Sequence, residues 1–448
     1  MRKLIITIII LFSMPAMMAQ NELTLDEAVS IALNKSTIVK KSLNNLKTFE
    51  SSLKTAYGGL LPNLSASGSW NWQRSEDEGT TFNFGGAIFT TPPSVTESRT
   101  YSANINSNWT LFDGLANISN VSKSENNLQS AKLSLERLKQ EIVFQTISLY
   151  YSVLNAKQLL KVQEDNVKQN QKNLETIMEK NRLGSVTLAD VYAQQVQTGN
   201  AELLEIQARN SFETAKSNLL YYLGLDVFEE FTFPDSLTSY ETNLLNEKLQ
   251  LEFENLSELV EQALAERLDY KSALLSLESA YDDITIARGG HFPRLTGNMG
   301  FSSFANTFNK LFESKSYSVG LTLSIPVFSG WAIDNSVQFA VVNAENKELE
   351  VNDLERTIRQ NIKQTFLDLE AAEKQLNVSG KNVAAALENL KIEQEKYSLG
   401  AGKLLDVLIA NTNYTEALTN QINSQFSFIT LSEQLKYYIG VLDYKKFE

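Results

Sequence analysis

The sequence predicts an α+β membrane protein in which one unit, a pair of strands followed by a very long helix, is present twice. Three observations lead to this prediction. Matching segments recur at constant offsets, four segments alternate between apolar and polar residues, and two longer stretches carry an apolar residue at every seventh position. The duplicated plan sets the order in which the elements are expected.

Two constant offsets define the repeat. "LFDG" at 111–114 matches "VFSG" at 327–330 at an offset of 216 residues, and "LLPNL" at 60–64 matches "HFPRL" at 291–295 at an offset of 231. The difference between the offsets predicts that the first copy holds 15 additional residues between Leu64 and Leu111. One insertion with otherwise constant spacing indicates a duplication rather than a chance similarity.

The composition excludes several classes of function. The 448 residues carry a net charge of −13, no cysteine and one histidine, His291. The acidic balance argues against a nucleic-acid partner, and the lack of cysteine removes disulfides, thiol catalysis and cysteine metal sites. "GAGK" at 400–403 lacks the upstream glycine and the following Ser or Thr of a phosphate loop. We therefore predict no enzyme, no cofactor and no metal site.

The N-terminus has the pattern of an export signal. Arg2 and Lys3 precede a short apolar core at 4–12, and the stretch 15–19 ends in a small residue. We predict a signal peptide at residues 1–19, and the alternative is a retained N-terminal anchor. Beyond it, no segment has the roughly 20 apolar residues that a membrane helix needs.

Each copy contains the same elements in the same order. A helical segment ends at a proline, two strands follow, and a very long helix leads through a glycine turn to a return helix. In the first copy, residues 20–225, we expect a helix at 23–60, strands at 64–74 and 100–112, a long helix at 114–183 and a return helix at 187–223. In the second copy, residues 255–448, we expect a helix at 256–289, strands at 294–304 and 316–327, a long helix at 330–399 and a return helix at 403–439. The segment 226–254 resembles neither copy and is expected to be an equatorial linker that lies against the helices.

The long helices carry a coiled-coil pattern. Apolar residues step by seven from Val121 to Leu149 and, after one step of four, again from Val153 to Leu174. The second copy has the same stutter, which locally unwinds a supercoil. We therefore expect helices that pack as a coiled coil straighter than an ordinary one.

The four strand segments divide into an apolar face and a face of small, uncharged polar residues. In "LSASGSWNWQ" at 64–73, apolar residues alternate with serine, asparagine and glutamine. Strands of about ten residues with aromatic residues near their ends are typical of a transmembrane β-barrel. The alternative is a sandwich with one solvated face, although soluble sheet surfaces usually carry charge. The predicted aromatic belt consists of Trp70, Trp72, Tyr101, Trp109, Phe301 and Tyr317.

Four strands cannot close a membrane barrel, and lipid does not tolerate open sheet edges. Two, three or four copies of the chain would supply eight, twelve or sixteen strands. The segments 75–99 and 305–315 are expected to be loops that face the outside, since such barrels carry their longer loops there.

Two glycine-containing turns are predicted where the long helices end. "RLGSVTLADV" at 182–191 matches "SLGAGKLLDV" at 398–407 at the offset of 216. Glycine caps the C-terminus of a helix readily because it adopts left-handed backbone angles. The exposed hairpin ends are expected to be Leu183, Gly184, Ser185 and Val186, with Leu399, Gly400, Ala401 and Gly402 in the second copy.

The chain resembles the outer membrane efflux proteins of the TolC family over nearly all of its mature length. The resemblance is carried by the duplicated plan, by Pro62 and Pro293 before the first strand of each copy, by "LFDG" and "VFSG", and by the two tip turns. It implies a homotrimer whose twelve strands form one barrel in the outer membrane and whose twelve helices form an α-barrel in the periplasm, where most of the mass lies. It also implies that the tips dock on a periplasmic adaptor and, through it, reach an inner-membrane pump.

The function implied by this resemblance is the outer-membrane exit channel of a tripartite efflux or type I secretion system for drugs or other exported substrates. The alternative is a structural or adhesive outer-membrane scaffold that transports nothing. The uncharged polar strand faces favour the channel, because they suit a water-filled lumen. Specificity for the cargo is expected to lie in the pump.

A gate is predicted at the tips. Asp190 and Asp406 occupy equivalent positions, so a trimer would bring six carboxylates to the narrow end of the tunnel. A negative constriction of this kind attracts cations. The alternative is a capping role, since Thr187-x-x-Asp190 fits a capping box.

The second tip departs from the family pattern, which resembles Tyr-x-x-Gly-x-Arg followed by Asp-x-x-Asp. Tyr397, Gly400 and Asp406 match it, whereas Gly402 stands at the arginine position and Ile409 at the second aspartate position. Lys403 is adjacent to the missing arginine and is the cation that could replace it in a closing network.

Overall fold

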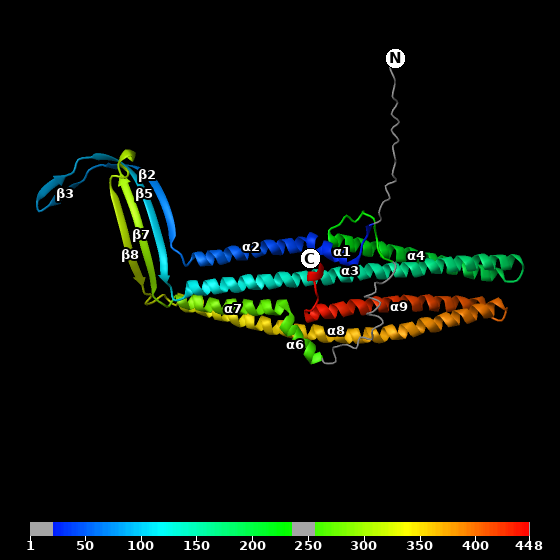
Figure 1. Ribbon diagram of the computed structural model, residues 1–448. Coiled ribbons are helices and arrows are strands. Elements are labelled where there is room, and N and C mark those ends of the chain that lie inside the picture. The colour runs from blue at the N-terminus through cyan, green and yellow to red at the C-terminus, as the bar shows by residue number, and fades with distance from the viewer. Residues whose placement is uncertain (1–20, 235–255, 448) are drawn as a thin grey trace, which may run out of the picture. The chain divides into compact units, whose positions relative to one another are not determined.

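The computed structural model describes residues 21–234 and 256–447 (Figure 1). The predicted signal peptide at 1–19 and most of the predicted linker, from residue 235 onward, lie outside the described residues. The described chain forms two compact units. The strand unit comprises residues 40–137 and 268–357, and the helix unit comprises residues 21–39, 138–234, 256–267 and 358–447.

The strand unit is built on a four-stranded antiparallel sheet in the order β2-β5-β7-β8 (Figure 1). Its strands are β2 (Asn63–Asp77), β5 (Ser94–Phe112), β7 (Arg294–Ala305) and β8 (Lys315–Ser324). The central pair, β5 and β7, joins the two copies of the repeat. Strands β2 and β8 are the edges, so the ladder of hydrogen bonds ends on each side of the sheet.

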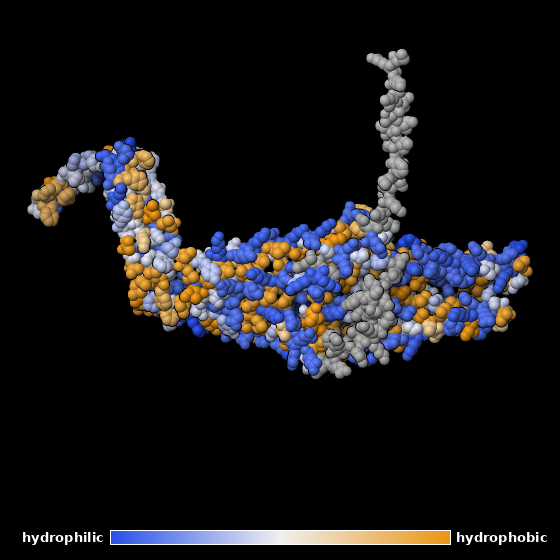
Figure 2. Space-filling view, in the orientation of Figure 1, coloured by the Kyte–Doolittle hydropathy of each residue, from blue (hydrophilic) through white to orange (hydrophobic). Residues whose placement is uncertain are grey.

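The register of the sheet places most apolar residues of the four strands on one face, and Phe304 is an exception on the other face. Ile105 lies opposite Ala66 on one side and Phe301 on the other, and Phe301 lies opposite Tyr317. Since side chains alternate along a strand, the intervening serines and asparagines share the second face. Side chains on the apolar face such as Met299 remain exposed in the single chain, and Figure 2 shows hydrophobic residues gathered over the strands.

The prediction of a loop at 75–99 is wrong, because most of this segment is strand. Strands β2 and β5 extend into it, and a second hairpin of β3 (Thr81–Phe84) and β4 (Ala87–Thr90) completes it. Phenylalanine, isoleucine and threonine flank a Gly85–Gly86 turn in which both glycines have positive φ. This combination favours a hairpin over an irregular loop. The shorter segment at 305–315 contains the 3₁₀ turn η1 (Phe308–Lys310).

Two helical hairpins follow the strand pairs. The first is formed by α3 (Ala116–Arg182) and α4 (Leu188–Leu223), and the second by α8 (Ala332–Ser398) and α9 (Leu404–Ile439). The return helices end at Gly224 and Gly440, which both adopt left-handed backbone angles. Of the helices within residues 21–234 and 256–447, none combines the length and the apolar composition that crossing a membrane requires.

The helices expected at 23–60 and 256–289 are each broken, into α1 (Leu25–Lys35) and α2 (Thr37–Gly58), and into α6 (Leu256–Glu266) and α7 (Leu268–Gly289). At the first break, the Ser36 hydroxyl accepts a hydrogen bond from the Val39 backbone N–H at 3.3 Å, which caps the start of α2. At the second break, the buried Arg267 donates to the Tyr438 carbonyl at 3.1 Å. The prediction of continuous helices is therefore wrong. At Ser36 the side chain caps a new helix, and at Arg267 the side chain ties the break to α9.

The described part of the linker packs against the helix unit. Strand β6 (Phe231–Thr232) pairs in parallel with β1 (Asn21–Glu22). Lys157 on α3 donates from Nζ to the Phe233 carbonyl, and the buried Phe233 ring lies edge-on to Tyr150 with centroids 6.0 Å apart. Residues 231–233 therefore lie against α3.

The glycine that precedes α3 gives a stability test. Gly114 has a φ of 71°, and a Cβ there would lie 2.7 Å from the Gly289 carbonyl oxygen, whereas Gly184 has a φ of 76° and no atom within 4 Å of a Cβ. We expect Gly114→Ala to lower the free energy of unfolding by about 2–5 kcal/mol, since left-handed backbone costs an alanine about 1–2 kcal/mol and an overpacked contact adds about 1–3 kcal/mol. Gly184→Ala is expected to lower the free energy of unfolding by only the backbone cost of about 1–2 kcal/mol. Chemical denaturation followed by circular dichroism measures both losses, and equal losses would contradict the packing role of Gly114.

Candidate functional site

The ends of the two helical hairpins form matching turns in the helix unit. Gly184 and Gly400 both have a φ of 76°. In the first turn, the Ser185 N–H donates to the Lys180 carbonyl at 2.8 Å, and the equivalent bond in the second turn is 2.9 Å long. This six-to-one bond belongs to a Schellman motif, in which a glycine adopts the left-handed conformation at low cost.

The eight residues predicted as hairpin ends lie in or beside these turns: Leu183, Gly184, Ser185, Val186, Leu399, Gly400, Ala401 and Gly402. The side chains of Leu183 and Leu399 are 64% and 75% exposed. An apolar side chain therefore projects from each hairpin end.

Asp190 is engaged in a capping box at the start of α4. Its Oδ2 atom accepts hydrogen bonds from the Thr187 backbone N–H at 3.0 Å and from the Thr187 hydroxyl at 2.7 Å. The Asp190 N–H in turn donates to Thr187 Oγ1 at 3.2 Å. These reciprocal bonds satisfy donors that the first helical turn leaves unpaired. The structure thus shows that Asp190 caps α4. This is the role that the sequence pattern gives as the alternative to a gate.

Asp406 is placed differently, although it is the equivalent residue of the second copy. Lys403 occupies the N-cap position of α9 and makes no side-chain cap, because an ammonium group cannot accept a hydrogen bond. Asp406 lies exposed in the first turn of that helix. The two hairpin ends therefore carry one carboxylate held by a capping box and one that faces solvent in the single chain.

Tyr397 joins the two hairpins. Its ring packs against Ile177 and Val191 of the first hairpin and against Leu404 of the second. Its hydroxyl is buried and has no hydrogen-bond partner among the described residues. Burial raises the pKa of the Tyr397 hydroxyl, and the negative charge of Asp190 raises this pKa further. The pKa of Tyr397 in the second hairpin therefore depends on the charge of Asp190 in the first hairpin.

The cation beside Tyr397 is Lys180. Its Nζ atom lies 4.8 Å from the centroid of the Tyr397 ring, which is within the range of a cation–π contact. Lys403, which the sequence offers as the substitute for the family arginine, is exposed at its N-cap position. Lys180 belongs to the other copy of the repeat, so only the packing of the two hairpins shows its pairing with Tyr397.

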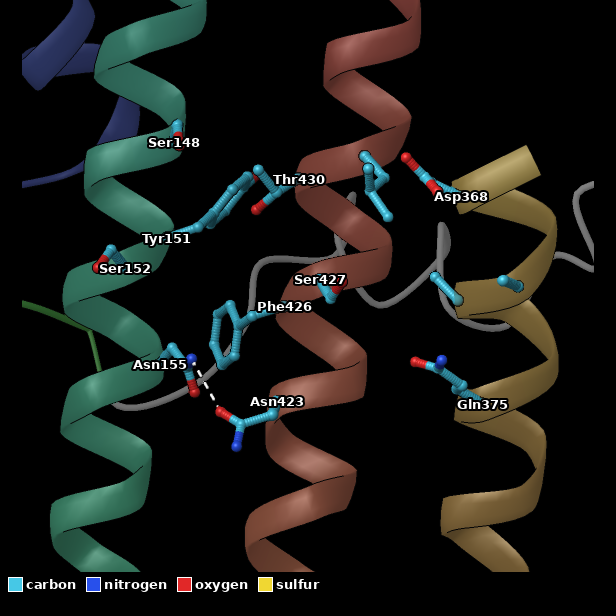
Figure 3. A pocket seen from close by; sticks show the side chains of 13 residues that line it. Ser148, Tyr151, Ser152, Asn155, Asp368, Gln375, Asn423, Phe426, Ser427 and Thr430 are labelled. Atoms are coloured by element: carbon cyan, nitrogen blue, oxygen red, sulfur yellow. Dashed lines mark hydrogen bonds between the residues drawn. The ribbon is translucent and has the colours of Figure 1, made fainter. Parts of the chain in front are cut away.

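A groove of about 620 Å³ lies between α3, α8 and α9 in the helix unit (Figure 3). Tyr151 and Phe426 contribute its aromatic wall, and Asn155 donates to Asn423 Oδ1 at 3.1 Å. Serine, threonine and glutamine side chains line most of the remainder, with Asp368 as the one carboxylate of the lining. The lining is therefore mainly neutral and polar, apart from Tyr151, Phe426, Leu431 and two alanines. Within residues 21–234 and 256–447, no group of three or more His, Asp or Glu side chains is placed to hold a metal ion.

The residues of the predicted aromatic belt are divided between the two ends of the sheet. Those toward the β3–β4 hairpin are Trp70, Trp72, Tyr101, Phe301 and Tyr317. Phe301 and Tyr317 face each other across β7 and β8 with ring centroids 5.3 Å apart. Trp109 lies at the opposite end, where its indole N–H donates to the Leu60 carbonyl at 2.9 Å. Aromatic rings are therefore present near both ends of the apolar face.

Known proteins similar in sequence to this chain are outer membrane efflux and secretion proteins. The family model described as outer membrane efflux protein matches residues 28–225 and 259–441, which covers most of both copies of the repeat. The chain is 23% identical over 316 residues to the outer membrane protein TolC of Escherichia coli K12, and this match covers 68% of the chain and 62% of that protein. It is 24% identical over 405 residues to TolC of Vibrio cholerae, covering 86% and 83% of the two chains. It is 22% identical over 365 residues to the alkaline protease secretion protein AprF of Pseudomonas aeruginosa, covering 79% and 73%. The chain thus spans less than two thirds of the length of the E. coli relative.

Solved structures of outer membrane channels share the fold. The chain is similar to CusC with a TM-score of 0.81 at 15% identity, covering 94% of this chain and 92% of that one. It is similar to the CmeC outer membrane channel of Campylobacter jejuni with a TM-score of 0.77 at 16% identity, covering 94% and 86%. The chain therefore has the fold of TolC-like channels.

The raised pKa of Tyr397 gives a pH test of the tip geometry. A tyrosine with a raised pKa in the folded state contributes stability that is fully present below the unfolded pKa of about 10 and is lost as the pH rises through the folded pKa. Asp190→Asn is expected to lower the pKa of Tyr397, because a negative charge is removed, whereas Asp406→Asn leaves it unchanged. Ultraviolet absorbance titration measures the pKa, with Tyr397→Phe to identify the signal. A pKa that moves with Asp406→Asn and not with Asp190→Asn would show that the tip is arranged differently.

Proposed function

The chain belongs to the outer membrane efflux protein family, and from this premise we propose that it is the outer-membrane exit channel of a tripartite efflux or type I secretion system. The observation that carries the proposal is the sheet register, which gives the four strands one mainly apolar face and one polar face whose charged residues, Asp77 and Arg294, lie at strand ends. A wall with two such faces suits lipid on one side and a water-filled lumen on the other. The protein acts here as a passive conduit.

Closure of this channel requires several copies of the chain. Strands β2 and β8 end the sheet on its two sides, and unpaired backbone groups are too costly to face lipid. Three copies, the number that the resemblance to the TolC family implies, supply twelve strands for one barrel. The same three copies supply twelve helices for a periplasmic α-barrel that continues the conduit.

The proposed channel lies in the outer membrane, with most of its mass in the periplasm. Outer-membrane lipid contacts the apolar face of the sheet, and the predicted aromatic belt lies at the two interfaces. The cross-strand pair Phe301 and Tyr317 and the opposite pair Trp70 and Tyr101 support this placement, because their rings share the apolar face near one end of the strands.

The partners of the proposed channel are a periplasmic adaptor and, indirectly, an inner-membrane transporter. The exposed Leu183 and Leu399 support docking of the adaptor on the two hairpin ends. The name of AprF ties that relative to secretion of an alkaline protease, and the family description refers to efflux. The transporter selects the cargo in this proposal, since the groove between α3, α8 and α9 and the polar strand faces have no side-chain arrangement specific for one substrate.

The gate of the proposed channel lies at the hairpin ends and is closed at rest. Three copies of Asp406 form a ring of exposed carboxylates, with Lys403 beside each. Asp190 contributes less to this ring, because its carboxylate is already engaged by its capping box. Tyr397, with Lys180 over its ring, holds the two hairpins together in the closed state.

Two substitutions on β8 separate the channel from the alternative of a scaffold that transports nothing. Leu321 lies on the apolar face and Thr322 on the polar face. We expect Leu321→Arg to disfavour membrane insertion by about 2–4 kcal/mol near the bilayer midplane, whereas Thr322→Arg inserts normally and alters ion selectivity. Outer-membrane yield and conductance in planar bilayers measure these effects. Wild-type protein that inserts but never conducts would support the scaffold, and equal loss in both variants would contradict the two faces.

The carboxylate ring makes a second prediction. We expect Asp406→Ala to reduce the block of single-channel current by divalent cations severalfold, because a ring of negative charge attracts cations. Asp190→Ala is the matched control at the equivalent position and is expected to have a smaller effect. Block that survives both substitutions would place the constriction elsewhere.

A further inference from the structure

The β3–β4 hairpin projects beyond the end of the four-stranded sheet (Figure 1). Strand β7 pairs with β5 only as far as Tyr101, whereas β2 stays paired with β5 to Asp77, and the pairing of β3 with β4 continues to Phe84. The 14 residues that follow Trp70, the partner of Tyr101, end at Phe84. At about 3.3 Å per residue, this two-stranded ribbon extends about 46 Å beyond the sheet.

One face of this hairpin is apolar. Phe82 lies opposite Phe89, and Phe84 lies opposite Ala87, so the alternation of side chains places these four residues on one face. The rings of Phe82 and Phe89 stack with centroids 5.6 Å apart, yet the three phenylalanine side chains remain between 50% and 77% exposed. The opposite face holds threonine, asparagine and Ile88. Figure 2 shows hydrophobic residues at the end of the hairpin, which therefore presents an uncovered apolar face.

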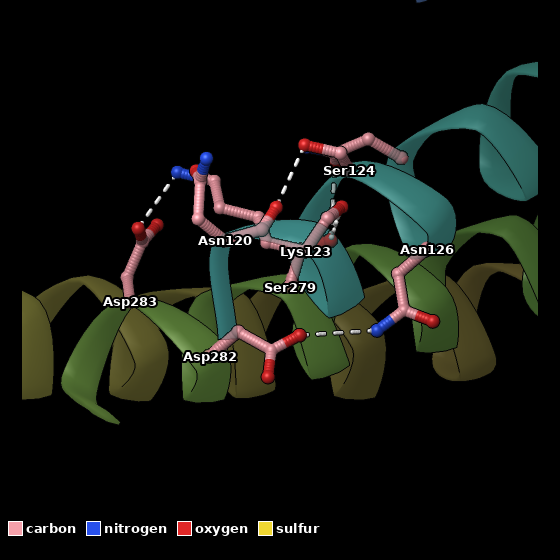
Figure 4. Close-up of polar contacts among 8 residues, drawn as sticks. Asn120, Lys123, Ser124, Asn126, Ser279, Asp282 and Asp283 are labelled. Atoms are coloured by element: carbon pink, nitrogen blue, oxygen red, sulfur yellow. Dashed lines mark hydrogen bonds and ion pairs between the residues drawn. The ribbon is translucent and has the colours of Figure 1, made fainter. Parts of the chain in front are cut away.

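Other elements of the strand unit are held by contacts with a neighbouring element. Helix α7 packs on α3 through polar bonds (Figure 4), in which Lys123 pairs with Asp283 at 2.7 Å and Asn126 donates to Asp282 at 3.2 Å. Among the described residues, β3 and β4 pack extensively only on each other. An isolated pair of strands is marginally stable in water, and a hydrophobic face needs further strands or a helix against it. The apolar face of the hairpin therefore lacks its cover within the described part of the chain.

The joint between the hairpin and the ribbon below it keeps one register. The pairing stops after Asp77 and resumes at Thr81 without a shift. Within the joint, the Thr91 N–H donates to the Thr80 carbonyl at 2.9 Å. Two-stranded ribbons twist more strongly than wider sheets, so the apolar face of the hairpin does not have to follow that of the sheet. The joint thus holds the hairpin at the full reach of the ribbon.

The distribution of charge indicates what covers this face. Residues 79–93 carry no charge, whereas the ribbon below them carries four acidic residues and two arginines: Glu76, Asp77, Glu78, Glu97, Arg74 and Arg99. An anionic membrane surface attracts basic residues, and this segment has an acidic excess. Contact between identical copies brings identical charges together, and like charges in contact repel. A hairpin without charge therefore suits contact with its own counterpart in another copy of the chain.

The ribbon is long enough for the hairpins of one ring to meet. Twelve strands spaced about 4.8 Å apart and tilted by about 40° close into a barrel with a radius of about 12 Å, which is well below the length of the ribbon. Each chain contributes one such hairpin, because the second repeat has only the short η1 turn between β7 and β8. Hairpins that start at one rim have a high effective concentration for each other.

We propose that the β3–β4 hairpins of one ring pack on each other through the face formed by Phe82, Phe84, Ala87 and Phe89, and so cover the outer mouth of the channel. This contact rests on the ring of three copies proposed above. It removes from water the apolar surface that each single chain leaves exposed, which is favourable. Because apolar contacts alone hold the cover, it opens for outgoing cargo without the breaking of any ion pair.

Cysteine cross-linking tests the cover, and the chain suits the test because it has no cysteine of its own. Under mild oxidation in outer membranes, Ala87→Cys is expected to form disulfide-linked dimers, since hairpins around one axis bring this face together. Ile88→Cys is the matched control on the opposite face of the same strand, and we expect it to form at least tenfold less dimer. Adding Phe84→Asp to Ala87→Cys is expected to reduce the dimer at least tenfold, because the introduced carboxylates repel each other.

The conductance of the same variants reports whether the packed hairpins cover the mouth. In planar bilayers, oxidation of the Ala87→Cys channel is expected to lower the conductance at least twofold, and a reductant is expected to restore it. The Ile88→Cys channel is expected to conduct equally before and after oxidation. The two variants differ only in the face of β4 that carries the thiol.

Dimers formed mainly by Ala87→Cys, together with the loss of conductance on oxidation, support the cover. Equal dimer at both positions, no dimer at position 87, or dimer without a change in conductance would overturn it. Two further results would assign the face to another occupant and overturn the cover as well. One is quenching by nitroxide-labelled lipids of a bimane attached to the Ala87→Cys variant in vesicles, which would show that the membrane covers the face. The other is a cross-linked product whose mass differs from that of two chains, which would show a foreign protein.

The proposed function and the cover fail in distinguishable ways. Reduced channels that conduct in any of these cases leave the exit channel intact. Wild-type protein that inserts into the membrane but never conducts would overturn the exit channel and, with it, the cover.

Discussion

Strands β2 and β8 leave a row of backbone N–H and C=O groups without sheet partners along each edge of the four-stranded sheet, and the whole architecture has to accommodate them. Unpaired N–H and C=O groups cost several kcal/mol each in lipid, so a sheet with an apolar face and two free edges is incomplete as a single chain. In the proposed assembly, other copies of the chain pair with both edges, the apolar face contacts lipid, and the polar face lines a lumen. Duplication of one strand pair supplies both halves of the sheet, and the two pairs have the same internal register when the repeat offsets are applied.

The hairpin ends show how the two copies diverged on a common backbone. Both turns use a left-handed glycine and the same six-to-one hydrogen bond. The helix that follows is capped by Thr187 and Asp190 in the first copy, whereas Lys403 in the second copy cannot cap. Asp406 is consequently left to solvent, while the charge of Asp190 acts on Tyr397 from the opposite hairpin. In the proposed gate, the two turns have the same backbone geometry but different roles. Tyr397 holds the hairpins together, and Asp406 meets the ions.

The sequence allows the architecture to be predicted because the repeat offsets and the strand alternation report long-range order directly. Hydrophobic periodicity does not reveal the helix breaks at Ser36 and Arg267, which coincide with a capping bond at Ser36 and a bond from Arg267 to the Tyr438 carbonyl. The sequence does not reveal the β3–β4 hairpin, because the acidic residues before it dominate the local pattern. At the tips, the turns could be placed from their glycines, but the contact of Lys180 with Tyr397 joins residues of different copies and follows only from the packing of two hairpins.

The central claim is that several copies of the chain complete one sheet. Native mass spectrometry of the complex, extracted from the outer membrane in a mild detergent, counts the chains, each of 50.2 kDa less the predicted signal peptide. The account predicts a single species that contains three chains and no stable monomer. A membrane-inserted protein that is released as a monomer would contradict it.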